Sequence, residues 1–118
     1  MISPRVRAMV SEKPVEWVAN RRDVHGNTFT LHATMVEIAY GWWDVSYDGE
    51  HQYFTGDAEA AALIAWAWME RLRASDGVVS ITAASGQWNI YVHPDKVFTA
   101  PSLLDALAEA IEQTNIKE

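Results

Sequence analysis

Two stretches of this chain show the same order of sequence features, and this repetition limits the folds that the sequence can adopt. Residues 36–72 and 79–114 share an order of features: an alternating apolar segment, a turn, an aromatic strand, a Phe-Thr pair and an Ala/Leu-rich helical pattern. Trp43 in the first stretch matches Trp88 in the second, and Phe54 matches Phe98. The repeated order predicts a duplicated strand–strand–helix unit in which both tryptophans fill the core.

The first unit is organised around Asp48-Gly49, a strong signal for a two-residue β-hairpin turn. Both central positions of a type I′ turn need positive φ, which Asp and Gly accept. Counting outward from this turn places Trp43 opposite Phe54. Ser85-Gly86 predicts the corresponding hairpin in the second unit, and the "HPDK" of residues 93–96 predicts a tight turn after it.

In the strand that precedes this hairpin, the apolar residues of the two halves alternate in opposite registers and so point to opposite faces. Val36 and Ile38, matched by Val79 and Ile81 in the second unit, alternate with other residues and are expected to face the core. The upstream residues Phe29 and Leu31 have the opposite parity. A bend or a bulge near Thr34 would reconcile the two, and we therefore predict one or the other there.

Helical patterns close both units and also begin the chain. Gly56-Asp57 opens a helix expected to run to about Arg73, while Pro101 and the capping box "SLLD" of 102–105 start the last helix. Ser3-Pro4 can cap a short first helix that ends before Pro14. The "PVEWVANRR" that follows is compatible with either helix or strand.

The whole chain of 118 residues therefore fits a single domain. It divides into an N-terminal segment, 1–27, a first ββα-like unit, 28–73, and a second ββα unit, 78–114. We expect an α+β fold: an antiparallel sheet of four or five strands from the two repeats, with the helices packed on one face.

Composition excludes several classes of protein. The chain has no cysteine, so a disulfide scaffold, a Cys-based zinc site and a thiol nucleophile are excluded. The N-terminal arginines are not followed by an apolar run, as a secretory signal would require. The longest apolar stretch, "AEAAALIAWAWM", is shorter than the roughly twenty residues of a membrane span. We expect a soluble, cytoplasmic protein that does not enter a membrane.

The net charge of −7 is unevenly distributed. Residues 1–23 carry five basic and three acidic side chains, whereas the remainder carries four basic and thirteen acidic ones. Such an acidic body argues against binding nucleic acid through its phosphates. It allows binding to a partner with a basic surface, although acidic charge also serves solubility alone.

Motifs for catalysis or metal binding are missing. The four histidines stand outside every metal-binding spacing, no nucleophile elbow is present, and the six glycines are scattered as turn residues. We expect no catalytic residues, no metal and no cofactor. A small hydrolase remains an alternative, because a triad can assemble from distant positions.

Six tryptophans are the unusual feature of the composition. On the first long helix, Ile64, Trp68 and Leu72 form one stripe, and Trp66 lies about 160° away from Trp68, beside Met69. Trp42 has the opposite parity to its neighbour Trp43. Exposed Trp and Met side chains are typical of interfaces, so Trp66, Met69 and Trp42 are candidates for partner or homodimer contacts. In the alternative, the N-terminal segment folds over one of these faces.

Residues 78–113, with "QWNIYV" followed by "FTAPSLLDALAEAI", resemble small uncharacterised phage proteins of the phage ABA sandwich type. The resemblance implies a phage or prophage origin and a sheet with packed helices, and it implies no activity. We therefore expect a small acidic, non-catalytic interaction protein that binds a host protein, for example to inhibit host defence. The carboxylates expected to meet a basic host surface are those of Asp44, Asp48, Glu50, Asp57 and Glu59. The alternative is a homo-oligomeric structural or regulatory module.

Overall fold

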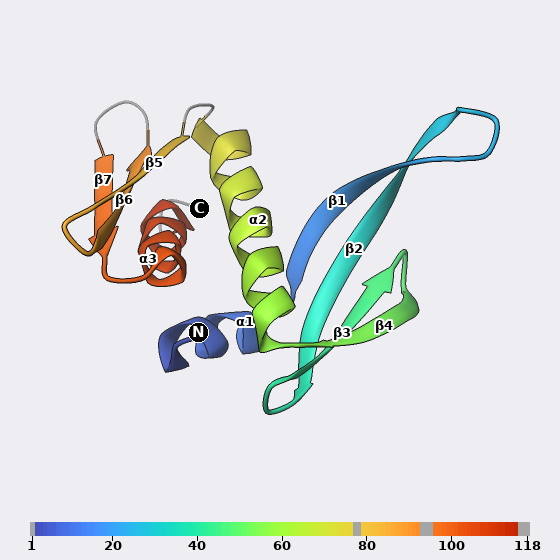
Figure 1. Ribbon diagram of the computed structural model, residues 1–118, viewed down its shortest axis with the longest axis horizontal. Coiled ribbons are helices and arrows are strands. Elements are labelled where there is room, and N and C mark those ends of the chain that lie inside the picture. Colours follow the sequence, from blue (N-terminus) through green and yellow to red (C-terminus); the bar gives the residue numbers. More distant parts are fainter. Residues whose placement is uncertain (1, 77–78, 93–95, 116–118) are drawn as a thin grey trace.

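The computed structural model describes residues 2–76, 79–92 and 96–115 (Figure 1). The fold is α+β: within these ranges, three helices accompany two antiparallel sheets of four and three strands, ordered β1-β2-β3-β4 and β5-β6-β7. In chain order the elements are α1 (Pro4–Glu12), β1 (Val15–Arg22), β2 (Thr28–Ala39), β3 (Trp42–Tyr47), β4 (Glu50–Gly56), α2 (Asp57–Asp76), β5 (Val79–Ala84), β6 (Gln87–Val92), β7 (Lys96–Ala100) and α3 (Leu103–Asn115).

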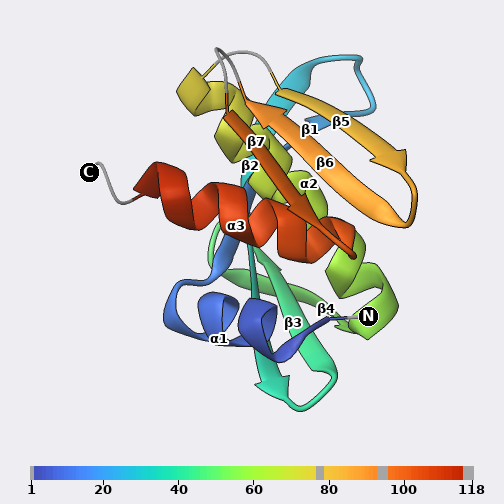
Figure 2. The ribbon, with the colours of Figure 1, turned by 90° about the vertical axis from the view of Figure 1, so that its left-hand side faces the viewer.

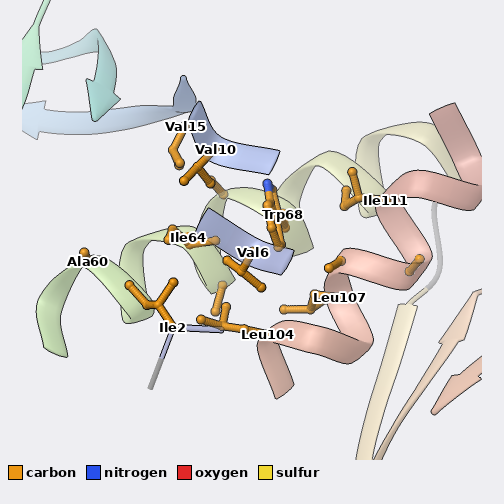
Figure 3. Packing of buried hydrophobic residues seen from close by; sticks show 14 of the residues in the cluster. Ile2, Val6, Val10, Val15, Ala60, Ile64, Trp68, Leu104, Leu107 and Ile111 are labelled. Carbon is orange, nitrogen blue, oxygen red and sulfur yellow. The ribbon is translucent and has the colours of Figure 1, made fainter. Parts of the chain in front are cut away.

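The helices form a layer between the two sheets (Figures 1 and 2). Helices α1 and α2 lie against the first sheet, α3 lies against β6 and β7 of the second sheet, and α2 crosses α3 in contact with it. Buried side chains from both sheets and all three helices join in one core, part of which is shown in Figure 3. Each sheet therefore has one face covered by helices and one face without helical cover.

The prediction of a single sheet is wrong, because the strands form two. Helix α2 has 20 residues and so spans about 30 Å, which carries the chain from the end of β4 across the helical layer before β5 begins. Both halves do run as three antiparallel strands followed by a helix, β2-β3-β4-α2 and β5-β6-β7-α3. The ββα duplication itself stays a prediction.

The N-terminal segment folds as its cap signals indicate. Ser3 is the N-cap of α1, with its hydroxyl accepting a hydrogen bond from the Val6 amide, and Val6 and Val10 are buried. The segment left open between helix and strand is a strand, β1. Its inward residues Val15 and Ala19 are buried and alternate with exposed ones, as in a half-buried strand.

The two hairpin turns form at the positions that the sequence predicts. Asp48 has a φ of 50° and Gly49 one of 86°, as a type I′ turn requires, and Ser85-Gly86 also has positive φ at both positions. Ser102 caps α3 as predicted, since its hydroxyl accepts a hydrogen bond from the Asp105 amide; it also donates one to the Asp105 carboxylate. The tight turn predicted for 93–96 lies mostly outside the described residues.

The hairpin register differs from the prediction by one residue at its far end. Tyr47 pairs with Glu50, but Trp43 pairs with Thr55 rather than with Phe54. The cause is a β-bulge at Gln52, the extra residue between the pairs that Ser46 and Val45 make with β4. Trp43 therefore faces the helices and is fully buried, whereas Phe54 points to the opposite face and is about half exposed.

The expectation that Val36 and Ile38 face the core is also wrong. Strand β2 continues the alternation of its first half, so that Ala33 and Met35 are buried while Val36 and Ile38 are exposed. No bulge occurs near Thr34; the irregularity in β2 lies between Glu37 and Ala39. Since Val79 and Ile81 pack against the core, the two units differ in parity at this strand.

Candidate functional site

The face of the first sheet that carries no helix is the candidate site, and we call it the open face. Strand alternation sends every second side chain of β1 to β4 to this face. Two cross-strand rows cross it: Val36, Asp44 and Phe54 form one, and Thr34, Ser46 and His51 form the next. In Figure 1 all three helices lie on the other side of this sheet.

Large apolar side chains are exposed on the open face. The exposed fractions are 52% for Val18, 37% for Val36, 47% for Trp42 and 48% for Phe54. The Trp42 and Phe54 rings stack with centroids 5.9 Å apart, and the His51 ring lies 4.4 Å from that of Phe54. We call Trp42, Phe54 and His51 the aromatic row. Its side chains hold each other in place, which forms a pre-organised apolar surface.

Asp44 orients the imidazole at the end of the aromatic row. Its carboxylate is hydrogen-bonded to Nδ1 of His51, diagonally across β3 and β4. Ser46 is the cross-strand partner of His51, so aspartate, histidine and serine share this face. In a catalytic triad the serine hydroxyl is hydrogen-bonded to the histidine. Among the described residues, Ser46 makes no hydrogen bond to His51, and the surface around the pair is an open sheet face rather than a cleft.

Asp57, a predicted binding residue, is a structural group at the corner of the fold. Its carboxylate accepts a hydrogen bond from Nε1 of Trp43 at 2.8 Å and pairs with the Arg7 guanidinium. The Trp43 hydrogen bond and the Arg7 charge, opposed by burial, hold the pKa of Asp57 below its usual value. Arg7 also pairs with Glu37, so this corner ties α1 to β2, β3 and α2.

Glu59 is exposed, and its carboxylate is likewise engaged with neighbouring side chains. It accepts hydrogen bonds from the Tyr53 hydroxyl at 2.6 Å and from the Thr55 hydroxyl at 3.2 Å, which fastens α2 to β4. Burial and the hydrogen bond to Glu59 raise the pKa of Tyr53 to about 12. The carboxylates of Asp57 and Glu59 are therefore both paired with side chains of this chain.

The other three predicted carboxylates belong to the β3–β4 hairpin, where Glu50 pairs with Tyr47 and so shares its helix-facing side of the sheet. Asp44 lies on the open face, and Asp48 and Glu50 flank the tip of the hairpin. Asp48 accepts a hydrogen bond from the His32 amide at 3.0 Å, and the Glu50 side chain is exposed. The predicted set of five acids is therefore divided between the open face, the hairpin tip and the helix-facing side of the sheet.

The tryptophan candidates are separated as well. Trp42 lies on the open face, whereas Trp66 and Met69 lie on α2, behind the other face of the sheet. Trp66 is 49% exposed and Met69 is half-buried. The N-terminal segment does cover the opposite stripe of α2, because α1 places Val6 and Val10 near Ile64 and Trp68 (Figure 3).

Phe54, His51 and Val36 were missed as members of the open face. Their position depends on the bulge at Gln52 and on the continuous alternation of β2, neither of which has a composition signal. The one available signal was Trp42, whose side chain must point to the face opposite Trp43. Side chains alternate along β3, so Asp44 and Ser46 lie on the same face as Trp42.

Comparisons of the chain with protein families, with curated proteins and with solved structures found no match. Within residues 2–76, 79–92 and 96–115, no helix is both long and apolar enough to cross a membrane. In that same part of the chain, no three His, Asp or Glu side chains gather closely enough to hold a metal ion.

Proposed function

We propose that this protein is a small non-catalytic interaction protein that binds a partner protein through the open face of its first sheet. The observation that carries the proposal is the aromatic row, which is exposed, has its rings in contact with one another and is not covered by any described helix. Contiguous exposed apolar surface of this kind marks interaction sites on soluble proteins. Tryptophan and other aromatic side chains dominate the energetics of such sites.

The charges favour a partner with a basic surface. The protein has a net charge of −7. Asp44 lies on the open face, and Asp48 lies at the hairpin tip at its end. An apolar centre bordered by carboxylates is complementary to an apolar patch bordered by Lys or Arg. The charge would steer the encounter and set its dependence on salt, while the aromatic row would supply the affinity.

The resemblance of residues 78–113 to phage proteins supports a host protein as the partner. In that version the protein is a phage or prophage accessory factor, and inhibition of a host defence protein is one form that its action could take. Such inhibition requires no catalytic residue, only a stable complex that occupies a surface of the host protein.

We expect Trp42→Asp to abolish partner capture, because it places a charge at the centre of the apolar surface. With immobilised protein and a host lysate, the wild type should retain a partner, and the affinity of the purified pair should fall at least about thirtyfold in the variant. Tyr91→Asp is the matched control, since Tyr91 is 42% exposed on the second sheet. A partner held equally by Trp42→Asp and the wild type would contradict the proposal, and so would an affinity that does not weaken with salt.

Self-association through α2 is the second candidate function, favoured by the 49% exposure of Trp66 next to Met69. If two copies meet there, Trp66→Asp should convert a dimer to a monomer when molecular mass is measured by light scattering. Trp42→Asp should leave that mass unchanged. A wild-type protein that is monomeric at high concentration would remove this candidate.

A further inference from the structure

The outer edge of β1 is the longest strand edge left unpaired in the described part of the fold. Strand β1 has eight residues and pairs with β2 without interruption, whereas the other edge strands, β4, β5 and β7, have seven, six and five residues. Strand β4 also carries the bulge at Gln52. Short length and bulges protect edge strands from pairing with other chains. The edge of β1 has neither form of protection.

The backbone of β1 presents unused hydrogen-bonding groups at this edge. On the neighbouring strand, the His32 carbonyl accepts a hydrogen bond from the Asp48 amide at 2.8 Å, and the His32 amide donates one to the Asp48 carboxylate at 3.0 Å. His32 therefore turns both backbone groups away from β1. Its cross-strand partner is Val18, and opposite residues of an antiparallel pair either bond to each other or both point outward. The N–H and C=O of Val18 consequently lie on the free edge, as do those of Glu16 by alternation.

The turn at the far end of β1 and β2 gives the same register. The Asp23 amide donates a hydrogen bond to the Asn27 carbonyl at 2.9 Å, so this pair is a bonded one. Bonded and unbonded pairs alternate along an antiparallel ladder. Counting back in twos makes Trp17 a bonded residue and leaves Val18 and Glu16 facing outward. Among the described residues, the four outward backbone groups of Val18 and Glu16 have no hydrogen-bond partner.

This edge borders a cavity of about 1000 Å³. Residues 13–18 form one wall, and residues of the three helices, Trp68 among them, form the others. The side chains of Glu16 and Val18 point to the open face, so it is their backbone that meets the cavity. Trp17, between them, directs its side chain to the helix side and packs against the core. The cavity therefore has a rim of backbone donors and acceptors beside an apolar wall.

We propose that the free edge of β1 binds an extended segment of a partner protein, which becomes a fifth, antiparallel strand of the first sheet. The two segment residues opposite Glu16 and Val18 exchange backbone hydrogen bonds with them. The residue between these two lies opposite Trp17 and directs a large apolar side chain, such as Leu, Met or Phe, into the cavity. In strand addition, main-chain hydrogen bonds supply affinity and pockets for alternate side chains supply specificity. This site goes beyond the proposed function and does not depend on the aromatic row.

The helices around the cavity favour a single segment over the sheet of a second copy. In Figure 1 β1 lies between β2 and α2, and α2 contacts β1. A strand added at the usual spacing of about 4.8 Å falls within the cavity. The further strands of a second copy would meet the residues of α2 and α3 that close it.

Amide hydrogen exchange, followed by NMR, tests the edge in the protein alone. The amides of Glu16 and Val18 should exchange at least about tenfold faster than the amide of Trp17, which bonds to β2. Equal protection of all three amides in dilute protein would show that the edge is already paired, and would overturn the proposal.

The binding probe is a mixture of acetylated, amidated pentapeptides with serine at both ends, threonine at positions 2 and 4, and Leu, Met or Phe at position 3. We expect saturable downfield shifts of the Glu16 and Val18 amide signals and slower exchange of both. N-methylation of both threonine amides, which face β1, should weaken binding at least about tenfold. N-methylation at position 3, where the N–H points away from β1, should change the affinity less than about twofold.

Two proline variants test the same edge from the side of the protein. Val18→Pro removes an outward N–H, which an edge strand tolerates, and should weaken binding of the pentapeptides at least about tenfold. Asn20→Pro is the matched control, because its N–H lies on the same edge but Asn20 does not line the cavity. If Val18→Pro does not fold, the methylated probes still decide the question on the wild type.

Three binding outcomes would also overturn the proposal. The first is no saturable shift of the Glu16 and Val18 amides at millimolar peptide. The second is equal binding of the probes with and without methylated threonines, which would mean that the apolar side chain alone is held. The third is protection of the Val18 amide that rises with protein concentration, which would assign the edge to a second copy. Trp42→Asp should leave the titration unchanged, so failure here and failure of the open face are distinguishable.

Discussion

Trp43→Ala is expected to lower the free energy of unfolding by about 3–5 kcal/mol, the largest effect of any single substitution considered. Trp43 has no exposed surface and is the largest of the fully buried side chains. Truncation would leave a cavity beneath β3 and would also remove the donor to Asp57. Urea denaturation followed by circular dichroism measures the loss.

Two tryptophan substitutions serve as controls for this result. Trp43→Phe retains a large ring and loses the hydrogen bond to Asp57, so its cost should be clearly smaller than that of Trp43→Ala. Trp66→Ala removes the same side chain from a half-exposed position on α2 and should cost only about 1 kcal/mol. If Trp43→Ala and Trp66→Ala cost the same, the burial of Trp43 described above would be wrong.

Arg7→Met is the second large effect, with an expected loss of about 3 kcal/mol. The Arg7 guanidinium is mostly buried, pairs with both Glu37 and Asp57, and lies 4.2 Å from the centroid of the Tyr40 ring. Methionine replaces the aliphatic part of the side chain but leaves two carboxylates at the corner without a counter-charge. Urea denaturation at pH 7 measures the difference, with Arg73→Met, an exposed helical pair partner, as the matched control.

Lowering the pH should reduce the difference in free energy of unfolding between the wild type and Arg7→Met. The pKa of Asp57 is lowered in the folded state, so its contribution to stability is present above the unfolded pKa of about 4 and is lost as the pH falls through the folded value. At about pH 3 the wild type should therefore have lost part of its advantage. A gap that widens on acidification would contradict the role assigned to the Asp57 carboxylate.

Local signals in the sequence predicted local structure well. Asp48-Gly49 makes the expected hairpin turn, Ser3 caps α1, and Ser102 caps α3. In each case the determining interaction joins residues at most a few positions apart, so a short stretch of sequence contains both partners. Helical periodicity also predicted the stripe of Ile64, Trp68 and Leu72, which is buried. Trp43 was expected in the core because it matches Trp88 in the repeated pattern, and it is fully buried.

The bulge at Gln52 shows where such reasoning fails. A turn sets the register only as far as the pairing remains regular, and one extra residue moves every later side chain to the other face. Phe54 was expected beside Trp43 in the core, and it lies in the aromatic row instead. The prediction that Val36 and Ile38 face the core failed for a related reason, since β-branched residues suit either face of a strand.

The division into two sheets could not be predicted from the strands themselves. Each strand pattern is compatible with several neighbours, and pairing between distant strands is decided by the packing of the helices. Here α2 separates β4 from β5, so both sheets place their apolar faces on a shared helical layer. The open face is a consequence, because the same helices cannot cover both sides of the first sheet.

Site-specific photo-cross-linking would test the central claim, that the open face binds the partner, most directly. A photo-reactive benzoylphenylalanine would replace Trp42, Trp66 or Tyr91, one position at a time, before partner capture and irradiation. The proposal predicts a cross-link to the captured partner from position 42 on the open face, and none from position 91 on the second sheet. Cross-linking from position 66 or 91 without any from position 42 would contradict it.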